Sequence, residues 1–248
     1  MINIIIILFL IFLSPALSAQ NTKESSIFCE KGDSKKCAEY IKTLYSKNKA
    51  EDGLSISKKY CSDRMPEVCI TGATIASFLN RYTDCTELLE KRCSEKMPMA
   101  CAILSDCLFE TGRLEESLPP AKIACENKIF DACSTVSAYY LGKDLRGESI
   151  LWAKKGCEGG SPMSCGAVAA LYVSDGEFKE AFDFAKKGCE LNDRNACKAA
   201  AVCCIKLKYG CENEFYEKCC KLNEKDCCSM ANKKKLKNKE EQQKPTDK

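Results

Sequence analysis

Cysteines in this sequence come in pairs, and the pairs repeat at a fixed interval along the chain. Two cysteines eight positions apart recur six times with a period of 32 positions, and a seventh pair follows after 31. A fixed period of this length is typical of proteins that stack one small structural unit many times. The pairs are Cys29 and Cys37, Cys61 and Cys69, Cys93 and Cys101, Cys125 and Cys133, Cys157 and Cys165, Cys189 and Cys197, and Cys220 and Cys228.

The fifth repeat shows what each unit contains. Small and apolar residues at helical spacing follow Cys165, a polar turn covers 174–176, and a second amphipathic stretch runs over 178–185. Gly176 can adopt the left-handed conformation that ends a helix. The period of two that marks β-strands is missing from the chain beyond Ala19. The sequence therefore predicts an all-α fold, an α/α superhelical solenoid of about six to seven 32-residue helix-turn-helix repeats cross-linked by disulfides.

The spacing of eight predicts where the paired cysteines lie. Within one helix, residues eight apart are separated by about 12 Å, whereas the Cα atoms of a disulfide lie within about 6.8 Å. The chain must therefore turn between the two cysteines. Pro66, Pro98 and Pro162 follow such turns at positions where proline can open a helix. Each pair is predicted to join the end of one repeat's second helix to the start of the next repeat's first helix.

One further pair lies on the same helical hairpin as an eight-spaced pair. Cys85 and Cys107 are placed almost symmetrically around the turn that separates Cys93 from Cys101. Residues that face each other across a hairpin are placed in this way. We therefore expect a second disulfide between Cys85 and Cys107, two helical turns further from the loop.

The last third of the chain leaves the pairing partly open. We expect Cys219 to pair with Cys227, and either Cys203 or Cys204 to pair with Cys211. The cysteine total of 21 is odd, so one thiol stays free or pairs between molecules. Cys203 and Cys204 are the candidates for that thiol.

The N-terminal segment predicts export. Residues 1–13 are almost purely apolar, and small residues lead up to Ala19. A core of about 11 apolar residues is too short to span a bilayer, so we interpret residues 1–19 as a signal peptide. An uncleaved anchor is the alternative. The repeat domain then covers 20–231, in a periplasmic or secreted protein without a stable membrane span, where thiols normally become disulfides.

The C-terminal segment has a different composition. Residues 232–248 hold seven lysines and three acidic residues, which predicts a charged, disordered tail. A polybasic site for a membrane or a partner is the alternative. The rest of the chain then has no excess of positive charge, so nucleic acid is not an expected partner.

The residue types also limit the chemistry. The chain has no histidine, which excludes Ser-His-Asp and Cys-His nucleophile systems and metal sites that need imidazole. Cys219, Cys220, Cys227 and Cys228 would suit a four-thiolate site for zinc or copper(I) in a reducing cell. Export, and the absence of any Cys-x-x-Cys motif, favour disulfides instead. We therefore expect neither a metal nor a cofactor.

Two segments carry a family resemblance. Ala-Lys-Lys-Gly-Cys-Glu occurs at 153–158 and again at 185–190, within the ladder of cysteine pairs. This pattern resembles Sel1-like repeats, and in particular the secreted Helicobacter-type cysteine-rich proteins, which are relatives of the tetratricopeptide superfamily. The resemblance covers about residues 28–230, although the 32-residue unit is shorter than that family's repeat. Pro119 and Pro120 fall within the third repeat's second helix, which they are expected to break or shorten.

The resemblance implies a concave groove lined by the first helices of the repeats, suited to a peptide or protein segment. Superposing the tetratricopeptide pattern on three repeats makes Met99, Phe109 and Met163 adaptable apolar contacts. Asp106 and Asp131 become polar anchors. Packing between repeats is the alternative role for all these positions. The full set is Met99, Ala102, Asp106 and Phe109, then Asp131, Ser134, Ala138 and Leu141, then Met163, Gly166, Ala170 and Val173.

The same resemblance raises an enzymatic alternative, since some relatives are described as penicillin-binding or weakly β-lactamase-active. Ser46 to Lys49 and Ser55 to Lys58 match the Ser-x-x-Lys element of serine β-lactamases, but Ser-Asp-Asn and Lys-Thr-Gly are missing. The sequence therefore favours an exported, monomeric and non-catalytic scaffold that binds a protein or peptide partner.

Overall fold

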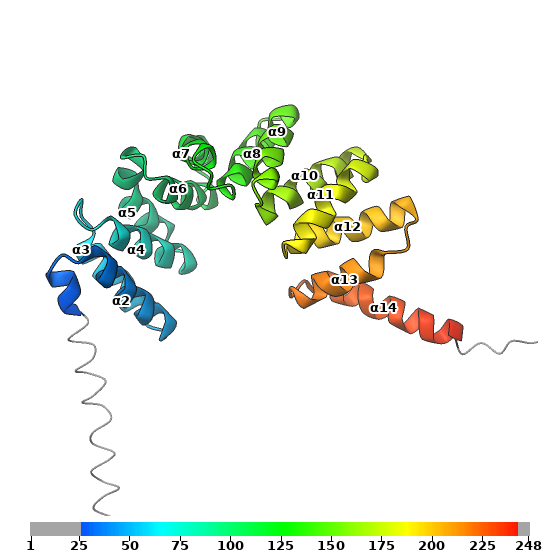
Figure 1. The fold of residues 1–248 in the computed structure, drawn as a ribbon, viewed down its shortest axis with the longest axis horizontal. Coiled ribbons are helices and arrows are strands. Elements are labelled where there is room, and N and C mark those ends of the chain that lie inside the picture. Colours follow the sequence, from blue (N-terminus) through cyan, green and yellow to red (C-terminus); the bar gives the residue numbers. More distant parts are fainter. Residues whose placement is uncertain (1–25, 243–248) are drawn as a thin grey trace, which may run out of the picture. The chain divides into compact units, whose positions relative to one another are not determined.

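The computed structural model describes residues 26–242, with side chains up to residue 233, and this part of the chain is helical and contains no β-strand. It falls into two compact units, separated between residues 111 and 112. Within each unit, successive helices pack against each other in chain order, which confirms the predicted all-α repeat solenoid. Figure 1 shows this order by colour.

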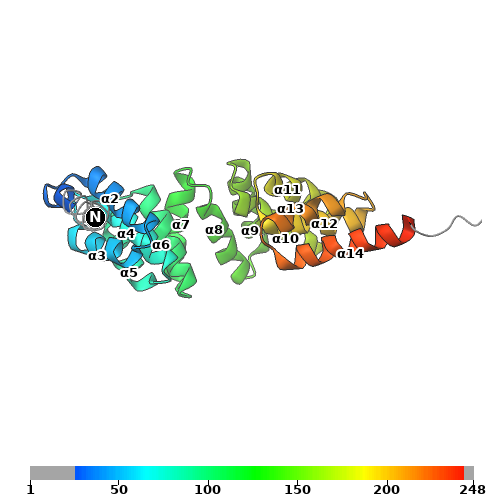
Figure 2. The same cartoon turned by 90° about the horizontal axis from the view of Figure 1, so that it is seen from below.

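Unit 1 is built in two layers. Its first helices form one layer, in which α4 lies between α2 and α6 and packs against both (Figures 1 and 2). The second helices, α3 and α5, pack against the first helices but barely touch each other. The first helices of unit 1 thus lie closer together than its second helices. The first-helix layer is therefore the concave side of this unit. The elements are a helix over 26–30, α2 (Ser34–Ser46), α3 (Ala50–Tyr60), α4 (Pro66–Phe78), α5 (Tyr82–Ser94) and α6 (Pro98–Glu110).

Unit 2 continues the same alternation with a core of small residues. Each helix packs on the next, and α10 also packs against α8 and α12. Alanines and disulfide sulfurs fill most of the core at its C-terminal end, together with Phe215 and Tyr216. The elements are α7 (Leu114–Glu126), α8 (Ala132–Gly142), α9 (Arg146–Glu158), α10 (Pro162–Asp175), α11 (Phe178–Glu190), α12 (Arg194–Leu207), α13 (Glu212–Lys221) and α14 (Lys225–Gln242).

Left-handed residues end the helices at regular positions. A residue with positive φ closes the first helix of each repeat, because only this conformation lets the last carbonyls bond to the returning chain. Gly176, predicted for this role, has φ of 78°. Pro66, Pro98 and Pro162 open helices, also as predicted. The closing residues, each 32 positions after the previous one, are Asn48, Asn80, Gly112, Asp144, Gly176 and Lys208.

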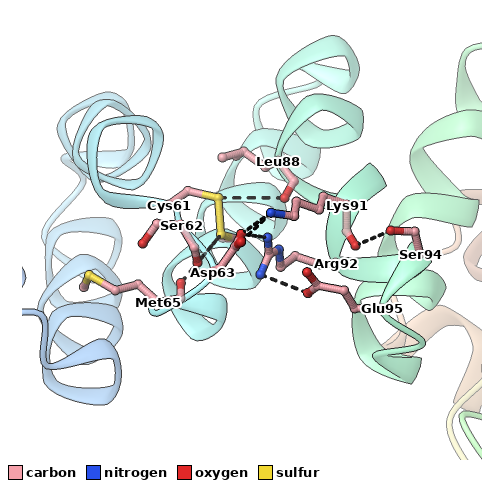
Figure 3. A network of polar contacts seen from close by, with 10 residues as sticks. Cys61, Ser62, Asp63, Met65, Leu88, Lys91, Arg92, Ser94 and Glu95 are labelled. Carbon is pink, nitrogen blue, oxygen red and sulfur yellow. Dashed lines mark hydrogen bonds and ion pairs between the residues drawn. A yellow bond between two sulfur atoms is a disulfide. The ribbon is translucent and has the colours of Figure 1, made fainter.

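The turn between α3 and α4 has no residue with positive φ. Cys61 is extended there, with φ of −59° and ψ of 118°. Asp63, in the same turn, accepts hydrogen bonds from Lys91 and Arg92 of α5 (Figure 3). Arg92 is 3% exposed and also pairs with Glu95 at 3.0 Å. Hydrogen bonds from Lys91 and then from Arg92 lower the pKa of the Asp63 carboxyl. The network ties this turn to the next repeat.

Disulfides join every second helix to the first helix that follows it. Cys85–Cys107 adds a second bridge between α5 and α6, and Cys219–Cys227 adds one between α13 and α14, whereas Cys204–Cys211 links α12 to the start of α13. The thiol left over is Cys203, which is buried. The eight-spaced bridges are Cys29–Cys37, Cys61–Cys69, Cys93–Cys101, Cys125–Cys133, Cys157–Cys165, Cys189–Cys197 and Cys220–Cys228.

The expectation for Pro119 and Pro120 is wrong. Both lie inside α7, which is neither broken nor shorter than α5, α9 or α11. The missing N–H groups leave only the carbonyls of Glu115 and Glu116 without helical partners. These two residues lie in the exposed first turn, where water can bond to the carbonyls.

The C-terminal segment also differs from its prediction. Helix α14 continues to Gln242, so residues 232–242 of the supposedly disordered tail are helical. Lys, Leu, Glu and Gln are good helix formers, and the next proline in the sequence is Pro245. Residues 243–248 lie outside the described part.

The predicted signal peptide, residues 1–19, and the start of the repeat domain up to residue 25 also lie outside the described part. Across residues 26–242, none of the helices combines the length and the apolar character that crossing a bilayer would require.

Candidate functional site

A groove on the first-helix side of unit 1 is the candidate site. Its cavity is about 230 Å³ and is bordered by three successive first helices. We call it the unit-1 groove. Its lining is Lys42 and Tyr45 from α2, then Ile70, Thr71, Thr74, Ile75 and Phe78 from α4, then Met99 and Ile103 from α6.

Large apolar side chains are exposed along this groove. Phe78, the last residue of α4, is 66% exposed, Met99 is 48% exposed and Tyr45 is 41% exposed. The rings of Tyr45 and Phe78 stack with centroids 5.6 Å apart. The stack holds Phe78 in place although most of its surface faces solvent. Exposed apolar groups gathered in one concavity are typical of binding sites.

Few polar groups interrupt the groove. The Thr74 hydroxyl donates to the Ile70 carbonyl at 2.8 Å, so this threonine presents its methyl group. Thr71 is 7% exposed, and its hydroxyl has no hydrogen-bond partner among the described residues. Lys42 is exposed and forms no ion pair within the part of the chain that the structure describes. The groove therefore offers apolar walls, the hydroxyls of Thr71 and Tyr45, and one cation.

Among the predicted groove residues of unit 1, Met99 lines the groove. Asp106 is exposed and Phe109 is half-buried on α6, and neither belongs to the lining. Ala102 is buried, so packing between helices is its role.

The other candidates lie in unit 2. Asp131 is exposed before α8, Met163 is exposed near the start of α10, and Val173 is half-buried near its end. Gly166 is buried: a Cβ there would lie 2.5 Å from the Asp193 carboxylate oxygen. Gly166 therefore packs against the next repeat and cannot contact a ligand.

Sequence reasoning missed most of the groove because it examined only the third to fifth repeats. Ile70 and Thr74 lie 32 positions before the predicted groove residues Ala102 and Asp106. Lys42 and Tyr45 lie 64 positions before Asp106 and Phe109. All four line the groove. The regular period was the signal that could have found them.

The residues considered for a serine nucleophile and for a metal site have other surroundings. Ser46 is the last residue of α2, and its hydroxyl donates to the Thr43 carbonyl. Ser55 is exposed on α3, and Lys58 forms an ion pair with Asp84 at 2.6 Å. Across the described residues, no group of three or more cysteine or carboxylate side chains is arranged to hold a metal ion. The four cysteines considered for a thiolate site are joined in the two disulfides between α13 and α14.

Comparison with solved structures defines the class of protein. YrrB, described as a TPR protein with an unusual peptide-binding site, matches 72% of this chain and 96% of its own, with 14% identity and a TM-score of 0.52. PilF of Pseudomonas aeruginosa matches 76% of this chain and 90% of its own, with 9% identity and a TM-score of 0.61. TTC0263, a TPR protein of Thermus thermophilus, matches 69% of this chain and 99% of its own, with 17% identity and a TM-score of 0.53.

The chain is therefore a helical repeat solenoid of the tetratricopeptide type, with disulfides at its repeat junctions. At these identities the likeness shows the fold alone. No protein-family model matches the sequence, and no curated protein matches it significantly.

Proposed function

We propose that this protein is an exported, monomeric and non-catalytic scaffold of the Sel1-like, cysteine-rich kind, which binds a protein or peptide partner in the unit-1 groove. The ten disulfides support an oxidising compartment, the periplasm or the outside of the cell, because such bonds are rare in reducing ones. The peptide-binding site for which YrrB is described supports a similar use of this fold.

The single observation that carries the proposal is the unit-1 groove itself. Three successive first helices present exposed Tyr45, Phe78 and Met99 around one cavity. Burying an aromatic or large aliphatic side chain contributes about 1.5–3 kcal/mol. Covering all three side chains therefore contributes at most about 5–9 kcal/mol. The cost of association reduces this sum, so a partner also needs contacts with the rest of the groove.

A displayed random-peptide library panned on the oxidised protein tests this. We expect the recovered peptides to bind wild type and to lose at least about tenfold in affinity, or about 1.4 kcal/mol, when Phe78 becomes Asp. Leu151→Asp is the matched control, since Leu151 is 62% exposed on α9 of unit 2. Peptides that bind wild type and Phe78→Asp equally well would contradict the proposal.

Export is tested separately by sequencing the N-terminus of the protein from periplasm and from culture medium. The proposed cleavage gives a mature chain beginning near Gln20. A chain that keeps its first residues would contradict it.

A further inference from the structure

The lining of the unit-1 groove contains a single charged side chain, Lys42 on α2. Glu39 precedes it by about one helical turn and is exposed, but the two side chains form no ion pair in the described part of the chain. An ammonium group at the edge of an apolar surface attracts a carboxylate more strongly than one in open water, because the surrounding surface lowers the effective dielectric constant.

The repeat register places this charge at one edge of the groove. Lys42 and Thr74 occupy the same position on α2 and α4, 32 positions apart, and both belong to the lining. An acidic group of a ligand is therefore attracted at the α2 edge.

The apolar part of the groove lies beside Lys42. Ile70 and Ile75 of α4 and Met99 and Ile103 of α6 form the walls, and Phe78 borders them. An aromatic ring fits these walls, because methionine and aliphatic side chains adapt to its shape and Phe78 offers a ring to pack against.

The hydroxyl of Thr71 gives an independent observation. Thr71 is more than nine-tenths buried in this lining, and its hydroxyl bonds to no described residue. The hydroxyl oxygen itself is not fully buried, so water can reach it. A hydrogen-bonding group of a ligand can take the place of that water.

From these observations we infer that the partner contributes a short segment in which an aromatic residue is followed or preceded by an acidic one. The ring enters between α4 and α6, and the carboxylate pairs with Lys42. This inference rests on the proposed function and specifies the partner of the same groove.

Four labelled synthetic peptides of equal length test the inference by fluorescence anisotropy with the oxidised full chain. They contain a phenylalanine beside an aspartate, beside an asparagine or beside a lysine, and in the fourth peptide alanine replaces the phenylalanine beside the aspartate. We expect the Phe-Asp peptide to bind about three- to tenfold more tightly than the Phe-Asn peptide, at low salt above all. The alanine peptide should lose at least about tenfold.

Substitution of Lys42 separates charge from shape. In Lys42→Glu the preference should reverse, so that the Phe-Lys peptide binds more tightly than the Phe-Asp peptide. Lys179→Glu is the matched control, because Lys179 is an exposed lysine on α11 of unit 2, and it should leave the order unchanged.

The outcomes distinguish the two proposals. Equal binding of the Phe-Asp and Phe-Asn peptides, unchanged in Lys42→Glu, overturns the acidic part of this inference. Equal binding of the alanine peptide overturns the aromatic part. In both cases, library peptides that depend on Phe78 would still support the groove as a binding site. If neither library nor synthetic peptides bind, both proposals are wrong.

Discussion

Single glycines decide how closely the repeats can approach at their junctions. Gly188, beside the Cys189–Cys197 bridge, is buried, and a Cβ at this position would lie 2.6 Å from the Ala196 Cβ and 3.0 Å from the Cys165 Cβ. Gly156 occupies the equivalent place one repeat earlier, where an added Cβ would lie 2.2 Å from the Ser164 Oγ. The sequence shows these glycines, but only the packing shows why no side chain fits.

Gly188→Ala should therefore lower the free energy of unfolding by about 1–3 kcal/mol, because the added methyl group has to displace packed neighbours. Urea denaturation of the oxidised protein measures this. Gly147→Ala on α9 is the control: a Cβ there meets nothing within 4 Å, so the helix should gain up to about 1 kcal/mol. Equal effects at the two sites would contradict this explanation.

The burial of the free thiol of Cys203 makes the stability of the fold depend on pH. Desolvation raises the pKa of this thiol from 9.0 to about 11. Because the folded state holds the proton more tightly than the unfolded state, the stabilisation is fully present below the unfolded pKa and is lost as the pH rises through about 9 to 11. The Cys203→Ala variant should lack this part of the alkaline loss of stability.

Thermal unfolding of wild type and Cys203→Ala across that pH window measures the difference. A reagent for thiols should react with native wild type slowly and with denatured, unreduced wild type at one site. Rapid reaction of the native protein would contradict the burial of Cys203.

At the scale of helices, the last helix of each unit has two bridges to the helix before it. Helix α6 is tied to α5 by Cys85–Cys107 and Cys93–Cys101, and α14 is tied to α13 by two more. Each of these two helices is therefore held to its predecessor by two covalent links, and each link restricts the unfolded chain.

Removal of the Cys85–Cys107 bridge by a double substitution to alanine should lower the stability of unit 1 by about 2–4 kcal/mol. Hydrogen exchange should accelerate in α6 more than in α2. Peptide binding should weaken as well, because α6 supplies Met99 and Ile103 to the groove. Unchanged exchange in α6 would show that its packing alone holds it.

The sequence predicted helices well where cysteines and turn residues define the repeat. Left-handed residues such as Asn80 and Gly176 stand at the expected intervals. Pro119 and Pro120 misled the prediction, because propensity alone does not show that the unpaired carbonyls of α7 are exposed. The conformation of the α3–α4 turn could not be predicted either, since it depends on a hydrogen bond from Arg92, on another helix, to Asp63.

At the scale of the whole molecule, the candidate site depends on which face of each helix is left uncovered. The repeat period assigns Lys42, Thr74 and Asp106 to one row, but it does not show that the lining of the groove includes the first two and not the third. That difference comes from the packing of α4 between α2 and α6. Exposure of Phe78 likewise follows from its place at the end of α4.

Disulfides should account for most of the stability of the whole chain. Each eight-spaced bridge closes a loop of about nine residues, which restricts the unfolded chain by about 2.5 kcal/mol, and total stabilities are typically about 5–15 kcal/mol. Reduced and alkylated protein should therefore lose most of its helical circular dichroism at room temperature. A reduced protein that keeps its helical signal would contradict this.

Photo-crosslinking is the measurement that tests most directly whether the disulfide-clamped groove of unit 1 binds a partner. A peptide with a photoreactive phenylalanine analogue beside an aspartate should label fragments that contain Phe78 and Met99, and reduction of the protein should abolish the labelling. Labelling of α3 and α5 instead, or labelling of the groove that survives reduction unchanged, would contradict it.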